Sequence, residues 1–321
     1  MWINRDRMDS WNEDTAKSVD MFNRWFVEFA PQAFRATRER TAGTVIRAME
    51  QTDFLRKITP RILMQHPEIL PMMRMAMCPP IARDRLAGLA HASKNLLCSM
   101  EDKERPHIPP RMPADEREQQ LRSICKILKS MADKDMMRWL SEKREPTEEE
   151  VSRSATVVAD RLCGVLSDPI IRNAQEERQL QKIRKFLERK RYHLLESNPD
   201  FRSMKPGTFS FHSNVPVFED EMQTKTINVT VDVAIQPKKA AAGDLPLLME
   251  AKSAGDFTNT NKRRKEEATK IRQLKRTYGN GVSYTLFLCG YFDAAYLGYE
   301  GAEGIDWIWE HRISDLEKLG I

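Results

Sequence analysis

The stretch "LPLLMEAKSAGDFTNTNKRRKEEATKIRQLKRTYG", residues 245–279, decides the fold of the C-terminal half of this 321-residue chain. It opens with an apolar segment typical of a buried strand and continues into a basic segment of helical character. Glu250 and Lys252 stand two residues apart at the polar end of the strand, so strand geometry projects both side chains to one face. The sequence therefore predicts a neighbouring carboxylate and ammonium group where the strand ends.

A second carboxylate is expected beside this pair. Asp232 interrupts the alternating segment "KTINVTVDVAIQP", residues 225–237, at a point where Val231 and Val233 are expected to face the other way. The loop "PKKAAAGD" joins this segment to the next one, so the two strands can form a hairpin that brings Asp232 opposite Glu250. Two carboxylates that lie so close repel each other, and a cation between them would relieve the repulsion.

The donor atoms suit a magnesium ion, which prefers oxygen ligands. Asp232, Glu250 and the backbone carbonyl of Ala251 would bind it, and the ion could polarise a scissile phosphate and activate a water. Lys252 would orient that water or neutralise charge that develops on the phosphate. The predicted chemistry is Mg²⁺-dependent hydrolysis of a phosphodiester, with Asp232, Glu250 and Lys252 as catalytic residues. Without their sequence context, these three residues would more often belong to a surface strand that ends in a Glu-Lys pair than to a catalytic site.

The basic segment after Lys252 favours a nucleic-acid substrate. Residues 262–276 contain eight Lys and Arg residues but only two acidic residues, Glu266 and Glu267. Such a helix can follow phosphates, and asparagines before it can pair with base edges. The candidate DNA-binding residues are Asn259, Asn261, Lys262, Arg263, Arg264, Lys265 and Arg272. The alternative is a solubilising helix face with Asn259 or Thr260 as its N-cap.

Two further strands complete the predicted sheet. "GTFSFHSNVPVF", residues 207–218, alternates like a half-buried strand, and "VSYTLFLCGYF", residues 282–292, resembles a fully buried one. The last segment, residues 303–321, is predicted to be helical, and its Trp307, Trp309 and His311 are core anchors or a dimer surface. The fold class is mixed α/β (α+β), with a central mixed sheet flanked by helices.

The N-terminal half is predicted to be helical. Proline-interrupted helices run through it, and Pro31 and Asp168 are expected to open new helices. Methionines 72, 73, 75 and 77 are expected to fill core gaps rather than to bind a metal. Residues 103–116 contain four prolines and are predicted to be a connector, or else an arm that holds Arg111 against a phosphate.

Composition excludes several functional classes. No apolar run approaches the roughly 20 residues that span a bilayer, so no membrane partner is expected. No G-x-x-x-x-G-K-[ST] motif is present, which argues against ATP. The five cysteines lack a C-x-x-C pair and the six histidines lack an H-x-x-H pair, so we expect reduced thiols, no zinc site and a cytoplasmic location.

The order of these elements resembles a known nuclease core. A strand with an acid, a strand with E-x-K, a basic helix and a further strand are similar to the PD-(D/E)xK core, with Val231 where proline is usual. The segments "VADRLCGVLSDPIIRNAQE", "EAKSAGDFTNTNKRRKEEA", "LFLCGYFD" and "EGIDWIWEHRI" resemble the XamI family of Type II restriction endonucleases. The segments "FNRWFVEFAPQAFR" and "PPIARDRL" extend the resemblance towards the N-terminus.

This resemblance implies a Mg²⁺-dependent enzyme that cuts double-stranded DNA as a homodimer at a palindrome. In the member that gives the family its name, the palindrome is GTCGAC. The resemblance also implies a partner DNA methyltransferase. Residues 1–167 would form a helical region for gripping DNA or for dimerisation, and residues 168–321 the PD-(D/E)xK core. Many enzymes with this core take another carboxylate from the first helix, which makes Glu176 or Glu177 a candidate metal ligand. The rival functions are a structure-selective repair or junction nuclease and a non-cleaving DNA-binding protein.

Overall fold

The computed structural model describes residues 2–196, 200–220, 222–241, 243–256 and 260–321, with side chains undescribed for 260–263. The chain forms two compact units. The sheet unit combines Met1–Phe29 with Arg172–Ile321, and the helical unit is Ala30–Ile171. The first 29 residues therefore group with the sheet and with the segment that starts at Arg172. Within the described residues, every helix is too short or too polar to cross a membrane.

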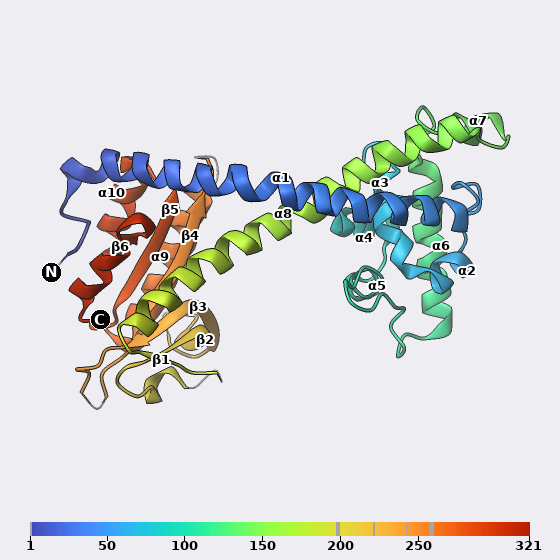
Figure 1. Ribbon diagram of the computed structural model, residues 1–321. Coiled ribbons are helices and arrows are strands. Elements are labelled where there is room, and N and C mark those ends of the chain that lie inside the picture. The colour runs from blue at the N-terminus through green and yellow to red at the C-terminus, as the bar shows by residue number, and fades with distance from the viewer. Residues whose placement is uncertain (1, 197–199, 221, 242, 257–259) are drawn as a thin grey trace. The chain divides into compact units, whose positions relative to one another are not determined.

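The sheet unit is built on one mixed six-stranded sheet, in which spatial order follows chain order (Figure 1). The strands are β1 (His193–Leu194), β2 (Thr208–Phe218), β3 (Thr226–Gln236), β4 (Leu247–Ala254), β5 (Tyr284–Gly290) and β6 (Asp306–Trp309). The pairs β2–β3 and β3–β4 are antiparallel, whereas β1–β2, β4–β5 and β5–β6 are parallel. This arrangement confirms the predicted mixed α/β fold.

Helices cover both faces of the sheet. The helices of this unit are η1 (Met8–Ser10), the first part of α1 (Trp11–Gln51), the last part of α8 (Glu148–Arg189), η3 (Phe201–Ser203), α9 (Thr260–Tyr278), α10 (Ala294–Ala302) and η4 (Glu310–Leu319). On one face, Leu248 and Leu286 pack with Ile271 of α9. On the other face, Met249 and Phe287 pack with Ile183 of α8. The alternation of neighbouring residues between two cores explains why these strands are apolar throughout.

The C-terminal segment begins with a strand, so its prediction as one helix is wrong. Asp306–Trp309 forms β6 at the edge of the sheet, and the 3₁₀ helix η4 follows it. Trp307 and Trp309 are fully buried, as expected for core anchors. Their apolar neighbours on β5 favour pairing over an isolated helix, since the strand buries both faces of the "DWIW" segment.

The helical unit consists of short helices enclosed by parts of two long ones. Besides parts of α1 and α8 it contains α2 (Pro60–Gln65), η2 (Pro67–Ile69), α3 (Leu70–Met75), α4 (Arg83–Ala90), α5 (Lys94–Met100), α6 (Ala114–Met131) and α7 (Arg138–Glu142). Met72, Met73, Met75 and Met77 are buried in its core, which confirms their predicted structural role. A buried ion pair joins Arg74 to Glu101, with Nε–Oε1 and Nη2–Oε2 distances of 2.7 and 2.8 Å.

Two predicted helix starts are wrong. Pro31 lies inside α1 and Pro169 lies inside α8, so each helix continues through its proline. A proline removes one backbone hydrogen bond from a helix and bends it, but it does not always end it. In α8, tertiary packing stabilises both sides of Pro169, because Leu162 and Leu180 are buried on either side of it.

Asp306 ties the N-terminus to the edge of the sheet. Its carboxylate accepts hydrogen bonds from the backbone N–H groups of Ile3, Asn4 and Arg5, the last two at 3.1 Å. The Asn4 amide donates to the Trp307 carbonyl at 2.7 Å. The Trp11 ring meets the Trp307 ring edge to face at 5.4 Å between centroids. Residues 1–29 therefore belong to the sheet unit through specific polar and aromatic contacts.

We expect Asp306→Ala to lower the free energy of unfolding by about 2–4 kcal/mol, because it leaves several buried N–H groups without an acceptor. Urea titration followed by circular dichroism would measure the loss. Asp6→Ala is the matched control, since Asp6 is an exposed acid in the same segment, and it should change stability by less than about 0.5 kcal/mol. Equal stability of the two variants would contradict this account of the N-terminal anchor.

Candidate active site

Glu250 and Lys252 lie side by side on β4, as the strand spacing predicts. The Lys252 Nζ atom is 3.0 Å from Glu250 Oε1. The Glu250 side chain is 9% exposed and the Lys252 side chain is 20% exposed, so the pair is largely removed from solvent. Both side chains contact α9, and this places the pair between the sheet and the basic helix.

Helix α9 adds two charged residues to the pair. Glu267 Oε1 lies 3.0 Å from Lys252 Nζ, and Lys270 Nζ lies 2.8 Å from Glu250 Oε2. Tyr284 of β5 donates its hydroxyl hydrogen bond to Glu267 Oε2. Glu267 and Lys270 are three residues apart on the face that also buries Ala268 and Ile271, so the helical period could have indicated that both point inward. The sequence instead suggested only exposed charges here.

These contacts keep Lys252 protonated. Burial lowers the pKa of Lys252, but Glu267 and Glu250 outweigh it and raise this pKa above its ordinary value. Burial and the nearby Glu267 carboxylate also raise the pKa of Tyr284 well above its usual range. At neutral pH the site therefore holds a lysine ammonium and a neutral tyrosine, so neither is arranged to act as a base.

Asp232 lies on β3 beside the same strand end. The pairs Val233–Met249 and Ala234–Leu248 fix the register, which places Asp232 level with Glu250 as predicted. Asp232 Oδ2 accepts a hydrogen bond from the Ala251 N–H at 2.8 Å. Burial and the Glu250 charge raise the pKa of Asp232 to about 6. Asp232 and Glu250 are thus neighbouring carboxylates, and Lys252 and Lys270 supply positive charge to Glu250.

The valines that flank Asp232 do not share a face, which corrects the simple alternation expected from the sequence. Val231 packs in the core against α9, whereas Val233 packs in the core against α8. The partner strand changes face at the same level, since Val215 belongs to the first core and Phe209 to the second. Irregularities of this kind re-aim side chains and are frequent next to active sites.

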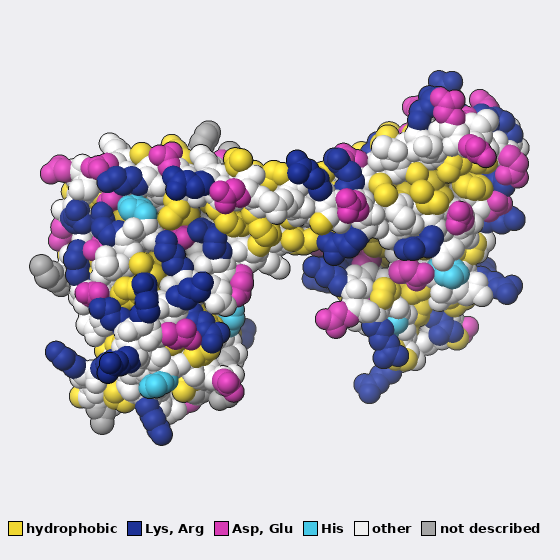
Figure 2. All heavy atoms as spheres, viewed as in Figure 1, with side chains coloured by type: hydrophobic (Ala, Val, Ile, Leu, Met, Phe, Trp, Pro, Cys, Tyr) yellow, Lys and Arg dark blue, Asp and Glu magenta, His cyan; other side chains and the backbone are white. Residues whose placement is uncertain are grey.

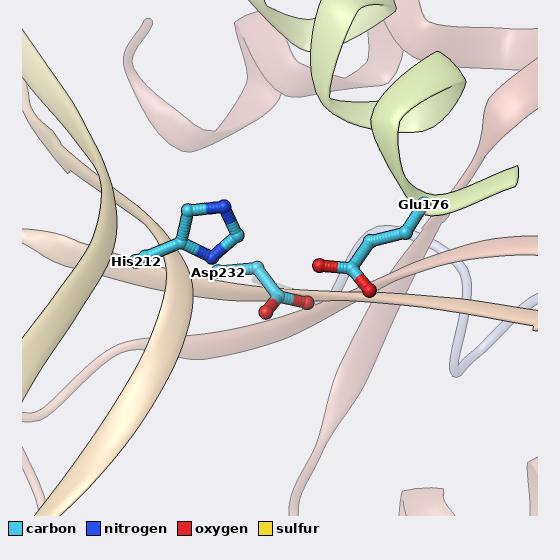
Figure 3. A group of neighbouring side chains, drawn as sticks. All are labelled: Glu176, His212 and Asp232. Carbon is cyan, nitrogen blue, oxygen red and sulfur yellow. The ribbon is translucent and has the colours of Figure 1, made fainter. Parts of the chain in front are cut away.

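A histidine and a helix glutamate accompany Asp232 (Figure 3). Glu176 of α8, His212 of β2 and Asp232 each offer a ligand atom, and these atoms lie within 4.8 Å of one another. Glu176 is thus the member of the predicted Glu176/Glu177 pair that approaches Asp232. Glu177 is exposed and accepts a hydrogen bond from Gln181 at 2.6 Å. His212 belongs to no motif spacing; only the β2–β3 register could have indicated it, because position 212 is level with position 232.

The predicted DNA-binding residues fall into three groups. Asn259 lies outside the described residues, as do the side chains of Asn261, Lys262 and Arg263. Lys265 is exposed, and the Arg272 side chain is 62% exposed. The Arg264 guanidinium lies 4.9 Å from the centre of the Tyr299 ring. Other cations of the helix bind the protein: Lys270 pairs with Glu250, and Lys275 and Arg276 donate to the carbonyls of Glu303 and Glu219.

Comparisons with known proteins identify the family of the chain. The family model described as XamI restriction endonuclease matches residues 53–309. The Type II restriction enzyme SalI of Streptomyces albus G is 50% identical over 322 aligned residues, which cover 99% of both chains. No solved structure matches the chain. With a family match that spans both units and a relative of this identity over the full length, the chain belongs to the XamI restriction endonuclease family.

Proposed function

We propose that this restriction endonuclease hydrolyses double-stranded DNA at a palindrome in a Mg²⁺-dependent reaction centred on Asp232, Glu250 and Lys252. The observation that carries the proposal is the juxtaposition of Asp232 with the Glu250–Lys252 pair on adjacent strands, at 3.0 Å between Lys252 Nζ and Glu250 Oε1. GTCGAC is the palindrome we expect, since the family resemblance implies it. The cut would be made in the cytoplasm, where a methyltransferase protects the host sites.

The donor set fits a hard divalent cation. Asp232 and Glu250 supply carboxylate oxygens, which are the ligands that a hard divalent cation prefers. Burial, and after it the Glu250 charge, raise the pKa of Asp232. The Ala251 carbonyl is the third predicted ligand. When bound, a divalent ion supplies Lewis acidity towards the scissile phosphate and lowers the pKa of a coordinated water.

Lys252 serves this reaction as a fixed positive charge. Two carboxylates at 3.0 Å hold its ammonium group, one from β4 and one from α9. Such a group stabilises negative charge on the phosphate without any reorganisation during the reaction. Glu267 acts through Lys252 as a positioning residue, and Tyr284 holds Glu267 in place.

DNA contact would be made by the exposed cations of α9. Lys265 and Arg272 are exposed, whereas Lys270 is directed into the site. The visible face of the sheet unit mixes basic and acidic side chains, so it does not mark out a DNA surface by charge alone (Figure 2). DNA recognition would therefore depend on α9 and on the segment before it. A palindrome mirrors a two-fold axis, which favours a homodimer with the helical unit as DNA grip or dimer surface.

Digestion of a fully sequenced plasmid tests the proposal. Wild-type protein with Mg²⁺ should give discrete ends that share GTCGAC, and EDTA should abolish them. Asp232→Ala and Lys252→Ala should each slow cleavage at least about 100-fold, because the first removes a ligand of the divalent ion and the second removes a positive charge at the phosphate. Lys225→Ala, which changes an exposed lysine paired with Glu219 at 2.5 Å, is the matched control and should cut like the wild type.

The alternatives predict other products. A structure-selective nuclease would give scattered ends, and a DNA-binding protein without activity would give none. Full cleavage by Lys252→Ala, or undiminished cleavage in EDTA, would contradict the proposed mechanism. Ends that share a different palindrome would preserve the mechanism and overturn only the expected site.

Glu267→Gln tests the positioning role. Loss of the carboxylate charge removes one of two anchors of Lys252, so we expect the single-turnover cleavage rate to fall about tenfold while DNA affinity measured without divalent ions stays unchanged. Glu266→Gln changes the adjacent exposed glutamate and should leave both quantities near wild type. A tenfold loss of DNA affinity in Glu267→Gln, with the rate preserved, would show that Glu267 serves binding instead.

A further inference from the structure

His212 approaches the candidate metal site from a strand to which the sequence assigned no site residue. Its ligand nitrogen lies within 4.8 Å of carboxylate oxygens of both Asp232 and Glu176 (Figure 3). The three residues come from β2, β3 and α8, so the fold and not local sequence brings them together. In Figure 3 the three side chains point towards one another.

The backbone of β2 presents this histidine in an uncommon conformation. His212 has a φ of 50° in the interior of a strand, in the left-handed region that few residues other than glycine adopt. The pairs Phe211–Val233 and Ser213–Val231 continue the β2–β3 ladder on either side of it. Ser210 and Ser213 are three residues apart, yet their hydroxyls lie 2.6 Å from each other because the strand changes face between them. His212 therefore owes its direction to this local change of face.

Ion pairs with lysine balance the charge of Glu250 more fully than those of Asp232 and Glu176. Glu250 is balanced by the ammonium groups of Lys252 and Lys270. Among the described side chains, by contrast, neither Asp232 nor Glu176 forms an ion pair with a Lys or Arg residue. The charge of Lys252, which is itself paired with Glu250, also acts on Asp232. Two carboxylates and an imidazole converge at this position. Their donor atoms are those of a mixed nitrogen and oxygen metal site.

We propose that Glu176, His212 and Asp232 bind a second divalent ion, next to the position formed by Asp232 and Glu250. This inference rests on the proposed function, because Asp232 is shared between the two positions. Carboxylate oxygens accept Mg²⁺ and Mn²⁺ alike, whereas an imidazole nitrogen favours Mn²⁺ and later transition ions over Mg²⁺. The histidine thus makes this second position selective for Mn²⁺ over Mg²⁺.

Binding of Mn²⁺ to the DNA-free full-length protein tests the inference directly. Electron spin echo envelope modulation of bound Mn²⁺ should show the coupling of a directly bound imidazole nitrogen. His212→Asn should remove this coupling and weaken Mn²⁺ binding, measured by calorimetry, at least about tenfold, since even residues that only orient a metal ligand contribute ten- to hundredfold. Asparagine is chosen because it tolerates the left-handed backbone at this position.

Two matched controls accompany this variant. His193→Asn changes an exposed histidine on β1 and should keep both the coupling and the affinity. Glu176→Gln should weaken Mn²⁺ binding about tenfold or more, whereas Glu177→Gln, at the neighbouring exposed residue, should not. In wild type Mn²⁺ should bind more tightly than Mg²⁺, and His212→Asn should reduce that preference.

The outcomes separate this inference from the proposed function. If Asp232→Ala abolishes Mn²⁺ binding while His212→Asn retains affinity and nitrogen coupling, the second position is refuted and the first one stands. If the wild type binds no Mn²⁺ and cleaves in EDTA, the metal-dependent function itself fails. Loss of nitrogen coupling in His212→Asn, with circular dichroism and urea stability like wild type, supports the second ion.

Discussion

The lysine ammonium shared by two buried carboxylates is the interaction on which the site depends. Lys252 joins Glu250 of β4 to Glu267 of α9, at 3.0 Å from each. The Glu267 side chain is only 1% exposed, so its charge would be costly without a partner. Docking of α9 on the sheet is therefore tied to the same ion pairs that hold Lys252 in place.

This coupling divides the basic helix into two functions. Its inward cations neutralise carboxylates or bind carbonyls of the sheet unit, as Lys270 does with Glu250 and with the Thr230 carbonyl at 3.1 Å. Its outward side carries exposed cations such as Lys265, whereas the exposed Arg272 lies 3.8 Å from Glu303 Oε2. A helix that looks uniformly basic in sequence thus pairs with the candidate site on one side and exposes cations on the other.

The change of face in β2 and β3 has a comparable effect on the proposed metal ligands. In a regular strand, residues two apart share a face, so Val231 and Val233 would pack in the same core. Here both strands change face at the level of His212 and Asp232, as the separation of Val231 and Val233 between two cores shows. Asp232 thereby lies near residues of both β4 and α8, so both proposed metal positions include it.

The sequence by itself determined the four strands β2 to β5, the neighbouring Glu250 and Lys252, and the acid level with them, because strand period and hairpin connection are local properties. It also indicated Glu176 through the resemblance to a nuclease core, and it correctly placed the methionines and tryptophans in cores. Only the tertiary structure decided that Glu267 and Lys270 complete the site and that His212 joins Asp232, since these contacts join elements far apart in the chain. Two local signals, at Pro31 and Pro169, did not end their helices. In α8, the buried Leu162 and Leu180 stabilise the helix on either side of Pro169.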